Sequence, residues 1–574
     1  MKTSEQLRDM LQDIDHRPYP QYKSLKGEYR FPGYLLSIDH VQGDPFAAPS
    51  HLSIRMEHGI CRFPKEYYEK EPARTALADY LLRQFHEKIR QFSFRAQGSG
   101  KSGLISVSAC GQEILKRSAL EITDREIIVR FHVGFPANGR TINARELDKI
   151  LFTYLPQAAP GALLYKNQDA KKLERQIFLM EDQAFLREYL AQNGLAAFVA
   201  DGSILPRESG ISDRPMKGAI PFQAPDSLRI CLNLPHRGEI SGMGIKAGIT
   251  LIVGGGYHGK STLLEALQMG IYPHIAGDGR EYVVTDPTAM KLRAEDGRFV
   301  KDVDVSLFIG SLPNGKDTKN FTTEDASGST SQAAGLIEAI EAGSHLFLID
   351  EDTSATNFMV RDALMQKVVA REKEPITPFL ERAVDLYTNA GISTILVAGS
   401  SGAFFHIADT IIQMDNYRPV DITSKAKELA RDFPLSGTQP SAFVLPKNRR
   451  VMTKDGAVHI RRDYYGNSTG RPEPLKIRTN GTDGFSIGRQ DVDLRYVEQI
   501  TDKEQMETLA QCLKTTVEKL VDGKRTVKDC ADFLCRLLAE KGFASISEYG
   551  TTFAGLALPR PQEIACCLNR YRRP

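Results

Sequence analysis

The stretch TLIVGGGYHGKSTLLEAL, residues 250–267, decides the fold of this chain. Gly254, four further residues and then Gly259-Lys260-Ser261 match the pattern G-x-x-x-x-G-K-S/T. An apolar strand precedes the pattern and a helix follows it. Glycines let the backbone curl so that consecutive N–H groups point at phosphate oxygens, and the helix N-terminus adds a positive dipole end. The stretch therefore predicts a phosphate-binding loop.

Two side chains after the loop have separate expected roles. Lys260 should reach the β- and γ-phosphates of a nucleoside triphosphate, and Ser261 should ligate Mg²⁺. A similar fragment, GSGKS at residues 98–102, has Arg95 where the first glycine belongs. A basic surface loop is therefore favoured there over a second nucleotide site.

An acidic strand supplies the ligand that a phosphate-bound metal ion needs. Residues 344–352, SHLFLIDED, form an apolar run that ends in three acids. A strand that delivers Asp350 beside the phosphates can hold Mg²⁺, usually through water. Glu351 then lies where a carboxylate can orient and deprotonate the attacking water. Solvated acids at an ordinary strand end are the alternative, which the phosphate loop disfavours.

The surrounding pattern indicates the fold class. From about 228 to 430, helices alternate with the short apolar runs TLIVGG, EYVVTD, LFLID, STILVAG and TIIQMD, which predicts a mainly parallel sheet covered by helices. Upstream, we expect helix over 70–95, strands within 103–135 and helix again over 143–200. Residues 500–548 are expected to be helical.

Composition excludes several classes of protein. The chain has 574 residues, of which 41% are apolar and 25% charged, as in soluble globular proteins. The net charge of +2 indicates no particular partner. Its eight cysteines form no C-x-x-C pair, which disfavours a disulfide framework or a zinc ribbon. Without a signal peptide or a run of about 18 apolar residues, the protein is expected to be cytoplasmic and not membrane-bound.

A second motif lies upstream of the acidic strand. ASGSTSQ, residues 326–332, opens a helix, and small residues there can approach a γ-phosphate through N–H groups and hydroxyls. On its own such a segment is also a common helix cap. It is similar to the signature of the ABC class, usually LSGGQ, with Gly328-Ser329 in place of the glycine pair.

The chain as a whole resembles the predicted ABC-class ATPases, a soluble family without transporter partners. The resemblance covers nearly the whole chain, because it extends to GEISGMGI (238–245), RAEDGR (293–298), LIDEDTSATNFMVRD (348–362), EPITPF (374–379), DHVQGDPFAAPS (39–50), GFPANGR (134–140) and LNRYRRP (568–574).

This resemblance implies an α/β fold, with a P-loop NTPase core of the ABC ATPase type and α+β flanking domains at the N- and C-terminal sides. The expected domains are an N-terminal domain over 1–205, the ATPase core over 206–430 and a C-terminal domain over 431–574. In the last, a basic strand and loop part precedes a helical part.

The resemblance also implies a mechanism that one chain cannot complete. In ABC proteins the signature of one protomer caps the ATP held by the phosphate loop of the other, so a homodimer with two sandwiched ATP molecules and Mg²⁺ is expected. Ser354 to Asn357 would match the loop that crosses the interface. Residues expected to bind nucleotide are Gly254, Gly255, Gly256, Tyr257, His258, Gly259, Lys260, Ser261, Thr262, Ser327, Gly328, Ser329 and Gln332. Those expected to be catalytic are Glu351 and Lys260, and those expected to bind metal are Ser261 and Asp350.

Two positions depart from the family pattern. ABC proteins usually have a His, called the switch His, directly after the strand that follows the acids. In this chain Gly399-Ser400-Ser401 occupies that place, so Ser400, Ser401 and His406 are all candidates for the role of the switch His. The Gln that couples ATP to a partner is not identifiable. Asp296 and Arg298 lie in its interval, where a plain surface turn is an equal alternative.

Local charge bears on what the ATPase acts on. Residues 441–490 contain ten Lys or Arg against four acids, and residues 81–120 contain seven against two. Basic side chains can follow a phosphate backbone while tyrosines such as Tyr464 and Tyr465 stack on bases, although charge runs are more often solvated surface. Because the resemblance includes RNA-associated members, RNA is the favoured partner. A small-molecule kinase and an ATPase subunit acting on a protein partner are the alternatives.

Overall fold

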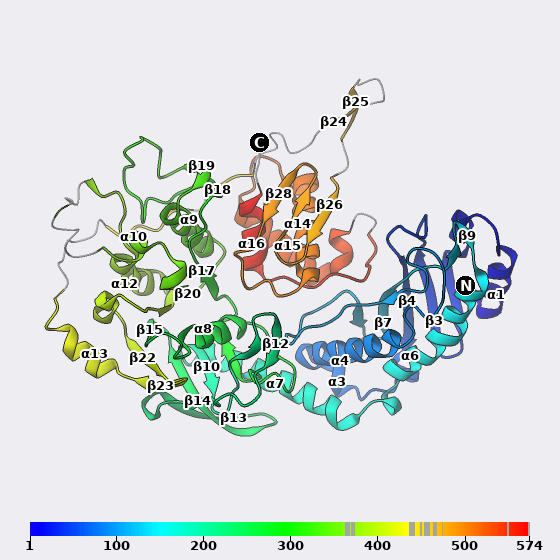
Figure 1. Ribbon diagram of the computed structural model, residues 1–574, viewed down its shortest axis with the longest axis horizontal. Helices are drawn as coiled ribbons and strands as arrows, with labels where there is room; N and C mark the ends of the chain where they lie inside the picture. Colours follow the sequence, from blue (N-terminus) through cyan, green and yellow to red (C-terminus); the bar gives the residue numbers. More distant parts are fainter. Residues whose placement is uncertain are drawn as a thin grey trace. The chain divides into compact units, whose positions relative to one another are not determined.

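The computed structural model describes residues 1–361, 368, 373–434, 442–447, 450–452, 460–462, 468–472, 475–547 and 550–571. Within it the chain forms two compact units. One comprises Met1–Glu181 together with Phe543–Leu558, and the other comprises Asp182–Gly542 together with Pro559–Pro574. Figure 1 traces the elements of both units along the chain.

The first unit is built on a sheet with the strand order β1-β2-β3-β4-β7-β5, and β6 also pairs with β7. Its strands are β1 (Lys2–Thr3), β2 (Gly27–Phe31), β3 (Tyr34–His40), β4 (Ser50–Glu57), β5 (Ile105–Ser106), β6 (Leu120–Ile122) and β7 (Glu126–Val133), and a small pair is β8 (Ala137–Asn138) and β9 (Thr141–Ile142). Its helices include α1 (Ser4–Asp13), α2 (His58–Cys61), α3 (Glu66–Glu69), α4 (Glu71–Arg90), α5 (Ala144–Lys149) and α6 (Leu155–Leu163).

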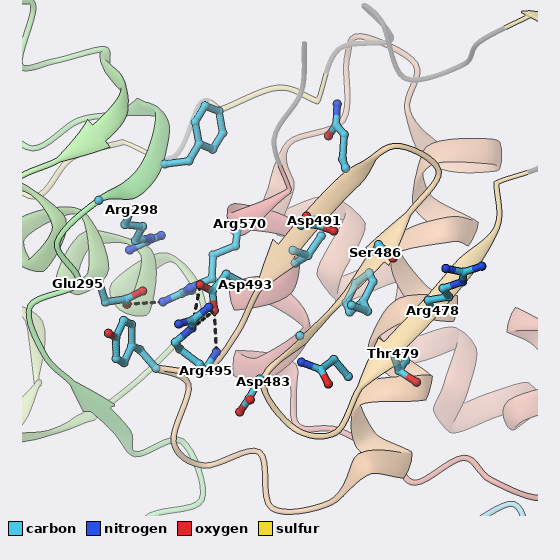
Figure 2. Close-up of a pocket in the computed structure, with 18 of the residues that line it drawn as sticks. Glu295, Arg298, Arg478, Thr479, Asp483, Ser486, Asp491, Asp493, Arg495 and Arg570 are labelled. Carbon is cyan, nitrogen blue, oxygen red and sulfur yellow. Dashed lines mark hydrogen bonds and ion pairs between the residues drawn. The ribbon is translucent and has the colours of Figure 1, made fainter.

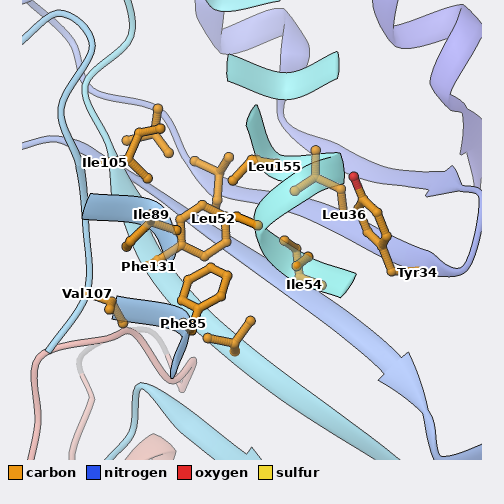
Figure 3. Close-up of a cluster of buried hydrophobic side chains, with 14 of the residues drawn as sticks. Tyr34, Leu36, Leu52, Ile54, Phe85, Ile89, Ile105, Val107, Phe131 and Leu155 are labelled. Carbon is orange, nitrogen blue, oxygen red and sulfur yellow. The ribbon is translucent and has the colours of Figure 1, made fainter. Parts of the chain in front are cut away.

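The core of this unit lies between the sheet and the helices α4 and α6. Figure 3 shows Phe85 and Ile89 of α4 beside Phe131 of β7 and Leu52 of β4, and all four side chains are buried. Strand β7 alternates buried and half-buried residues, as expected for a sheet with one face on a core. The helix expected over 70–95 and the strands expected within 103–135 are confirmed.

One expectation for this part of the chain is wrong. Residues 143–200 were expected to be helical, and α5, α6 and α7 (Ala170–Gln192) follow that pattern, but β10 (Leu195–Ala200) is a strand. It pairs antiparallel with β14 (Gly238–Lys246) on one side and β16 (Val283–Thr285) on the other. The run LAAFVA is buried almost throughout, and a short apolar run buried on both faces shows no period that separates strand from helix.

The second unit contains a six-stranded sheet with the order β17-β20-β21-β15-β22-β23. Its strands are β15 (Ile249–Val253), β17 (Met290–Leu292), β20 (Leu346–Asp350), β21 (Ser393–Val397), β22 (Thr410–Asp415) and β23 (Arg418–Asp421). All pairs are parallel except β22 with β23. The helices α8 (Lys260–Met269), α9 (Gly328–Glu341), α12 (Phe379–Ala390) and α13 (Thr423–Ala430) accompany this sheet. The predicted α/β fold with a parallel sheet is confirmed.

A second sheet corrects one expectation about that parallel sheet. EYVVTD was expected to join it, but β16 (Val283–Thr285) belongs to an antiparallel sheet with the order β13-β14-β10-β16. The other strands are β13 (Arg229–Leu234) and β14 (Gly238–Lys246). A short buried strand carries no information about the direction of its partner, so the sequence pattern alone could not separate the two sheets. A separate hairpin is formed by β11 (Arg207–Ser209) and β12 (Ser212–Pro215).

The C-terminal part of the second unit is an antiparallel sheet packed on helices. It contains β26 (Ile477–Asn480), β27 (Gly484–Ile487), β28 (Gln490–Asp493), α14 (Lys503–Thr515), α15 (Val527–Lys541) and α16 (Pro561–Arg570). Two further pairs are β18 (Arg298–Val303) with β19 (Phe321–Ala326), and β24 (Ile460–Arg462) with β25 (Ser468–Pro472). The helices expected over 500–548 are confirmed. No helix in the described part of the chain has the length and apolarity needed to cross a bilayer.

Candidate nucleotide-binding site

The glycine-rich loop between β15 and α8 has a backbone that only glycine permits at two positions. Gly254 has φ +142°, and a Cβ there would lie 2.5 Å from the carbonyl oxygen of Met414. Gly259 has φ +96°, and a Cβ there would lie 2.9 Å from a ring carbon of Tyr417. Because L side chains avoid this backbone region and no space is left for them, both glycines are required for the loop to close against β22 and β23.

The loop offers hydrogen-bond donors that the described chain does not use. The N–H groups of Gly255 to Gly259 make no hydrogen bond to any described residue. The Lys260 ammonium donates to the carbonyl oxygens of Gly254 at 2.7 Å and Gly255 at 2.9 Å. One of its three N–H groups is therefore left to bind a ligand. Ser261, in the first turn of α8, is exposed. Curled N–H donors, a lysine and a helix N-terminus together fit the phosphates of a nucleotide.

The two residues in the middle of the loop, Tyr257 and His258, have contrasting surroundings. Tyr257 has φ +64° and its side chain is 99% exposed, so an aromatic residue occupies left-handed backbone without any packing to compensate. The next residue fixes the loop in place, because Nδ1 of His258 accepts the N–H of Asn416 at 2.9 Å. The N–H of Tyr417 donates in turn to the carbonyl oxygen of His258 at 3.1 Å. The loop is thus held by the turn between β22 and β23.

The parallel sheet brings Asp350 to the same edge as the loop. Asp350 in β20 and Ile252 in β15 pair with the same residue, Val397, from the two sides of β21. Two strand spacings amount to about 10 Å, so the end of β20 lies near the loop that begins after β15. The Asp350 side chain is nearly buried, and its carboxylate accepts the N–H of Asp352 at 3.1 Å. A carboxylate and the Ser261 hydroxyl are oxygen ligands of the kind that Mg²⁺ prefers.

The Glu351 carboxylate is held by the turn after β21. It accepts the N–H groups of Gly399 at 2.6 Å and Ser400 at 3.0 Å, and the Ser400 hydroxyl at 2.7 Å. Burial raises the pKa of Glu351, but these hydrogen bonds outweigh it and hold the pKa below its ordinary value. Of the three candidates for the switch position, Ser400 is the one whose side chain contacts Glu351.

The signature segment begins α9 and contacts the loop after the acids. Ser327 is exposed at the N-cap of α9, Gly328 is half-buried and Ser329 is buried. Gln332 is fully buried, donates to the Ser354 hydroxyl at 2.9 Å and accepts the N–H of Ala355 at 2.9 Å. Within the chain Gln332 therefore supports the 354–357 loop, which continues into α10 (Thr356–Met359).

The segment RAEDGR packs against this signature. The N–H of Ala294 donates to the carbonyl of Thr353 at 3.0 Å, and the N–H of Glu295 donates to the Ser331 hydroxyl at 2.9 Å. Asp296 is exposed, and its carboxylate lies 3.2 Å from the position of a Cβ on Gly328. The surface-turn interpretation thus holds for Asp296 but not for Arg298, which is buried.

Sequence reasoning missed a buried ionic cluster behind the signature helix. Arg298 pairs with Glu338 of α9, and Arg450 pairs with Glu341 of the same helix. Arg450 also donates to the Asn569 side chain at 2.8 Å. The signal that could have revealed it is the pair of acids three residues apart within the apolar helix QAAGLIEAIEAG.

The same cluster includes an ion pair between the 293–298 segment and α16. Arg570 pairs with Glu295 at 2.5 Å. Burial raises the pKa of Glu295, but Arg570 and Arg298 outweigh this and hold it below its ordinary value. The cluster therefore ties α9 to both the 293–298 segment and the C-terminal helix.

The charge counts of the regions 81–120 and 441–490 do not show which basic side chains are exposed and which form ion pairs within the chain. Within 81–120, Lys116, Arg83 and Arg90 form ion pairs with Glu71, Asp79 and Glu87. Within 441–490, Arg450 is buried in the ionic cluster, whereas the following residues are exposed: Lys447, Lys476, Arg478 and Arg489. The side chains of Lys454, Arg461, Arg462, Tyr464, Tyr465 and Arg471 lie outside the described residues.

Three family models match consecutive parts of the chain. "ATPase of the ABC class N-terminal" matches residues 4–166, the P-loop domain of "ABC_ATPase" matches 169–449 and "MRB1590 C-terminal domain" matches 476–574. The uncharacterized protein MJ1628 of Methanocaldococcus jannaschii is 31% identical over 265 residues, which are 44% of this chain. The match spans 58% of that relative's length.

Solved structures of two components of ABC transporters also match the chain. The ADP conformation of MJ1267, an ATP-binding cassette of an ABC transporter, is 13% identical, with a TM-score of 0.23 over 33% of this chain and 88% of the other. CbiO1 from Clostridium perfringens, part of the transporter complex cbiONQ, is 15% identical, with a TM-score of 0.27 over 42% of this chain and 96% of the other.

Proposed function

Because this chain belongs to the ABC class of P-loop ATPases, we propose that it hydrolyses ATP with Mg²⁺ as a homodimer that binds RNA. The observation that carries the proposal is the convergence of three features at one edge of the parallel sheet. These are the loop N–H donors of Gly255 to Gly259, the Asp350 carboxylate and the Glu351 carboxylate.

In this proposal, each residue at that edge has one task. The loop N–H groups and Lys260 would hold the phosphates, and Ser261 and Asp350 would hold the metal ion, which would supply positive charge to the phosphates when bound. Glu351 accepts a hydrogen bond from the attacking water. Its lowered pKa keeps it ionised at neutral pH, which favours orienting the water and stabilising charge over strong proton abstraction.

A second copy of the chain would complete the site. Among the described residues, no hydrogen bond or ion pair joins the signature Ser327 to Ser329 with the phosphate loop of the same chain. Ser327 and Gly328 instead lie at the start of α9, where Ser327 is exposed. They are therefore available to a γ-phosphate held by another protomer.

The dimer is tested by blocking hydrolysis. Glu351→Gln with ATP and Mg²⁺ should elute from gel filtration as a dimer, because bound ATP is no longer consumed. Asp352→Asn is the matched control, since Asp352 is the next acid along the chain and is exposed. It should behave as the wild type does. A monomer for Glu351→Gln at saturating ATP would contradict the dimer.

RNA is tested by salt dependence and by crosslinking in cells. The exposed basic residues of the 441–490 region favour a phosphate backbone, so the affinity for a single-stranded RNA should fall steeply as salt rises. RNA crosslinked to wild type and to Glu351→Gln should be enriched in shared sequences. Phosphate release from ATP without an organic acceptor separates this function from a small-molecule kinase. Binding that does not change with salt would contradict the RNA proposal.

A further inference from the structure

A cavity of about 910 Å³ lies between the 295–299 segment and the C-terminal sheet β26-β27-β28. Figure 2 shows Arg298 and Glu295 on one side of it and Arg478, Ser486 and Asp491 on the other. Pockets that enclose small ligands have volumes of about 300–1,000 Å³, so this cavity is large enough for a nucleotide.

The wall formed by the sheet is polar. Strand register places Arg478, Ser486 and Asp491 in one row across the three strands, because Ser486 pairs with both of the others. Phe485 and Ile487, which alternate with Ser486, are buried. The face that borders the cavity therefore presents Arg478, the Ser486 hydroxyl and the Asp491 carboxylate, and the same segment also lines the cavity with Asp483, Arg489, Asp493 and Arg495. Arg478 makes no ion pair with a described residue and is exposed.

The opposite wall contains buried arginines with unused donors. The side chains of Arg298 and Arg570 are only 4% and 7% exposed. Nε and Nη1 of Arg298 and Nε of Arg570 are buried without a hydrogen-bond partner among the described residues. An unpaired buried donor is unfavourable, and more so when the group is charged. The planar guanidinium matches the oxygens of phosphate, so these donors indicate an anionic ligand.

We propose that this cavity binds a nucleotide unit. Its phosphate would lie between Arg298 and Arg478, and the N–H donors of its base would reach the Asp491 and Asn480 oxygens of the sheet face. The same chemistry is offered by a residue of an RNA strand and by a free mononucleotide. Only the first source rests on the proposed RNA function.

Occupation of the cavity would affect the ATP site through the segment that separates them. The backbone of Glu295 contacts Ser331 of the signature helix, while its side chain pairs with Arg570 at the cavity wall. A phosphate at this wall competes with Glu295 for Arg570. Binding should therefore change the rate of ATP turnover as well as fill the cavity.

The test measures binding with the ATP site already filled. Full-length protein saturated with ADP and Mg²⁺ is titrated with a 5′-phosphorylated tetraribonucleotide carrying fluorescein at its 3′ end, and anisotropy is recorded. Arg478→Glu should weaken binding at least tenfold. Lys503→Glu is the matched control, because it reverses the charge of an exposed cation of the same C-terminal part that neither lines the cavity nor belongs to the 441–490 region. It should weaken binding less than twofold.

Competition identifies the source of the nucleotide. Displacement of the probe by GMP, lost in Arg478→Glu, supports the cavity with a free nucleotide as its ligand. Binding of the probe that GMP does not displace supports an RNA strand. A third outcome is that the probe does not bind, while calorimetry detects binding of GMP that Arg478→Glu abolishes. This outcome supports the cavity as a nucleotide site and does not support the RNA function. Equal weakening by both charge reversals, or no binding of either ligand, would overturn the proposal.

Discussion

The phosphate-loop edge and the ionic cluster behind α9 place charged groups in opposite surroundings. At the loop, Lys260 and Ser261 are partly or fully accessible and the N–H groups have no partner in the described chain. In the cluster, Arg298, Arg450 and Glu338 are buried and paired with one another. The first arrangement keeps its binding capacity for a ligand. In the second, the ion pairs hold separate segments of the chain together, so damage should mainly reduce nucleotide binding at the loop and mainly reduce the stability of the fold at the cluster.

The largest effect should come from breaking the cluster. Arg450→Ala leaves Glu341 buried without its cation and leaves Glu338 with Arg298 alone, and loss of one partner of a buried pair costs about 3–5 kcal/mol. The unfolding midpoint in denaturant should fall accordingly, as followed by circular dichroism.

The control for this substitution is Lys447→Ala, a nearby and exposed cation. It should change the free energy of unfolding by less than about 0.5 kcal/mol, as surface substitutions usually do. The double variant Arg450→Ala with Glu341→Ala should recover part of the loss. Equal stability of Arg450→Ala and the wild type would show that the cluster does not support the fold.

The second effect concerns the loop edge. Glu351→Gln should reduce ATP turnover by about a hundredfold, equal to about 2.7 kcal/mol, because a neutral amide orients the attacking water less strongly and cannot stabilise its developing positive charge. Its unfolding midpoint should change little. Turnover is measured by phosphate release at saturating ATP, and Asp352→Asn should lie within threefold of the wild type. A comparable loss in both variants would remove Glu351 from its proposed role.

A smaller effect is expected for Ser400→Ala. The Ser400 hydroxyl stabilises the ionised form of Glu351 by a hydrogen bond, which contributes about 1 kcal/mol. Its removal should raise the pKa of Glu351 toward the ordinary value. The acid side of the pH profile of turnover, where Glu351 becomes protonated, should therefore move to higher pH. Ser401→Ala serves as the control, and the same shift in both variants would contradict a specific contact.

The smallest effect should come from Tyr257→Asn. Asn tolerates the left-handed backbone better than Tyr, and the exposed ring packs on nothing that would be lost. The protein should become more stable by about 0.5 kcal/mol, seen as a small rise in the unfolding midpoint. A fall in stability would mean that the ring makes a contact that matters.

The loop edge could be predicted from sequence and the cluster could not, for a physical reason. A phosphate loop needs its residues consecutive, so the strand, the glycines and Lys260 appear together in one stretch of chain. Asp350 and Glu351 follow because they end a neighbouring strand of the same sheet. The arginines of the cluster come from three distant segments, at Arg298, Arg450 and Arg570. In the sequence, each of them is indistinguishable from an ordinary surface cation. The same limit applies to strands, since the short runs that form β10 and β16 do not specify their partners.

The chain leaves its second unit at Gly542, contributes Phe543–Leu558 to the first and then returns. That inserted segment is bonded into place, because the N–H of Ser118 donates to the carbonyl of Leu556 and the Phe553 ring lies against His51. During synthesis, more than 360 residues of the second unit are therefore made before the last segment of the first unit leaves the ribosome. Three covalent crossings then join the units, so a single protease cut at any one of them would leave the two halves attached.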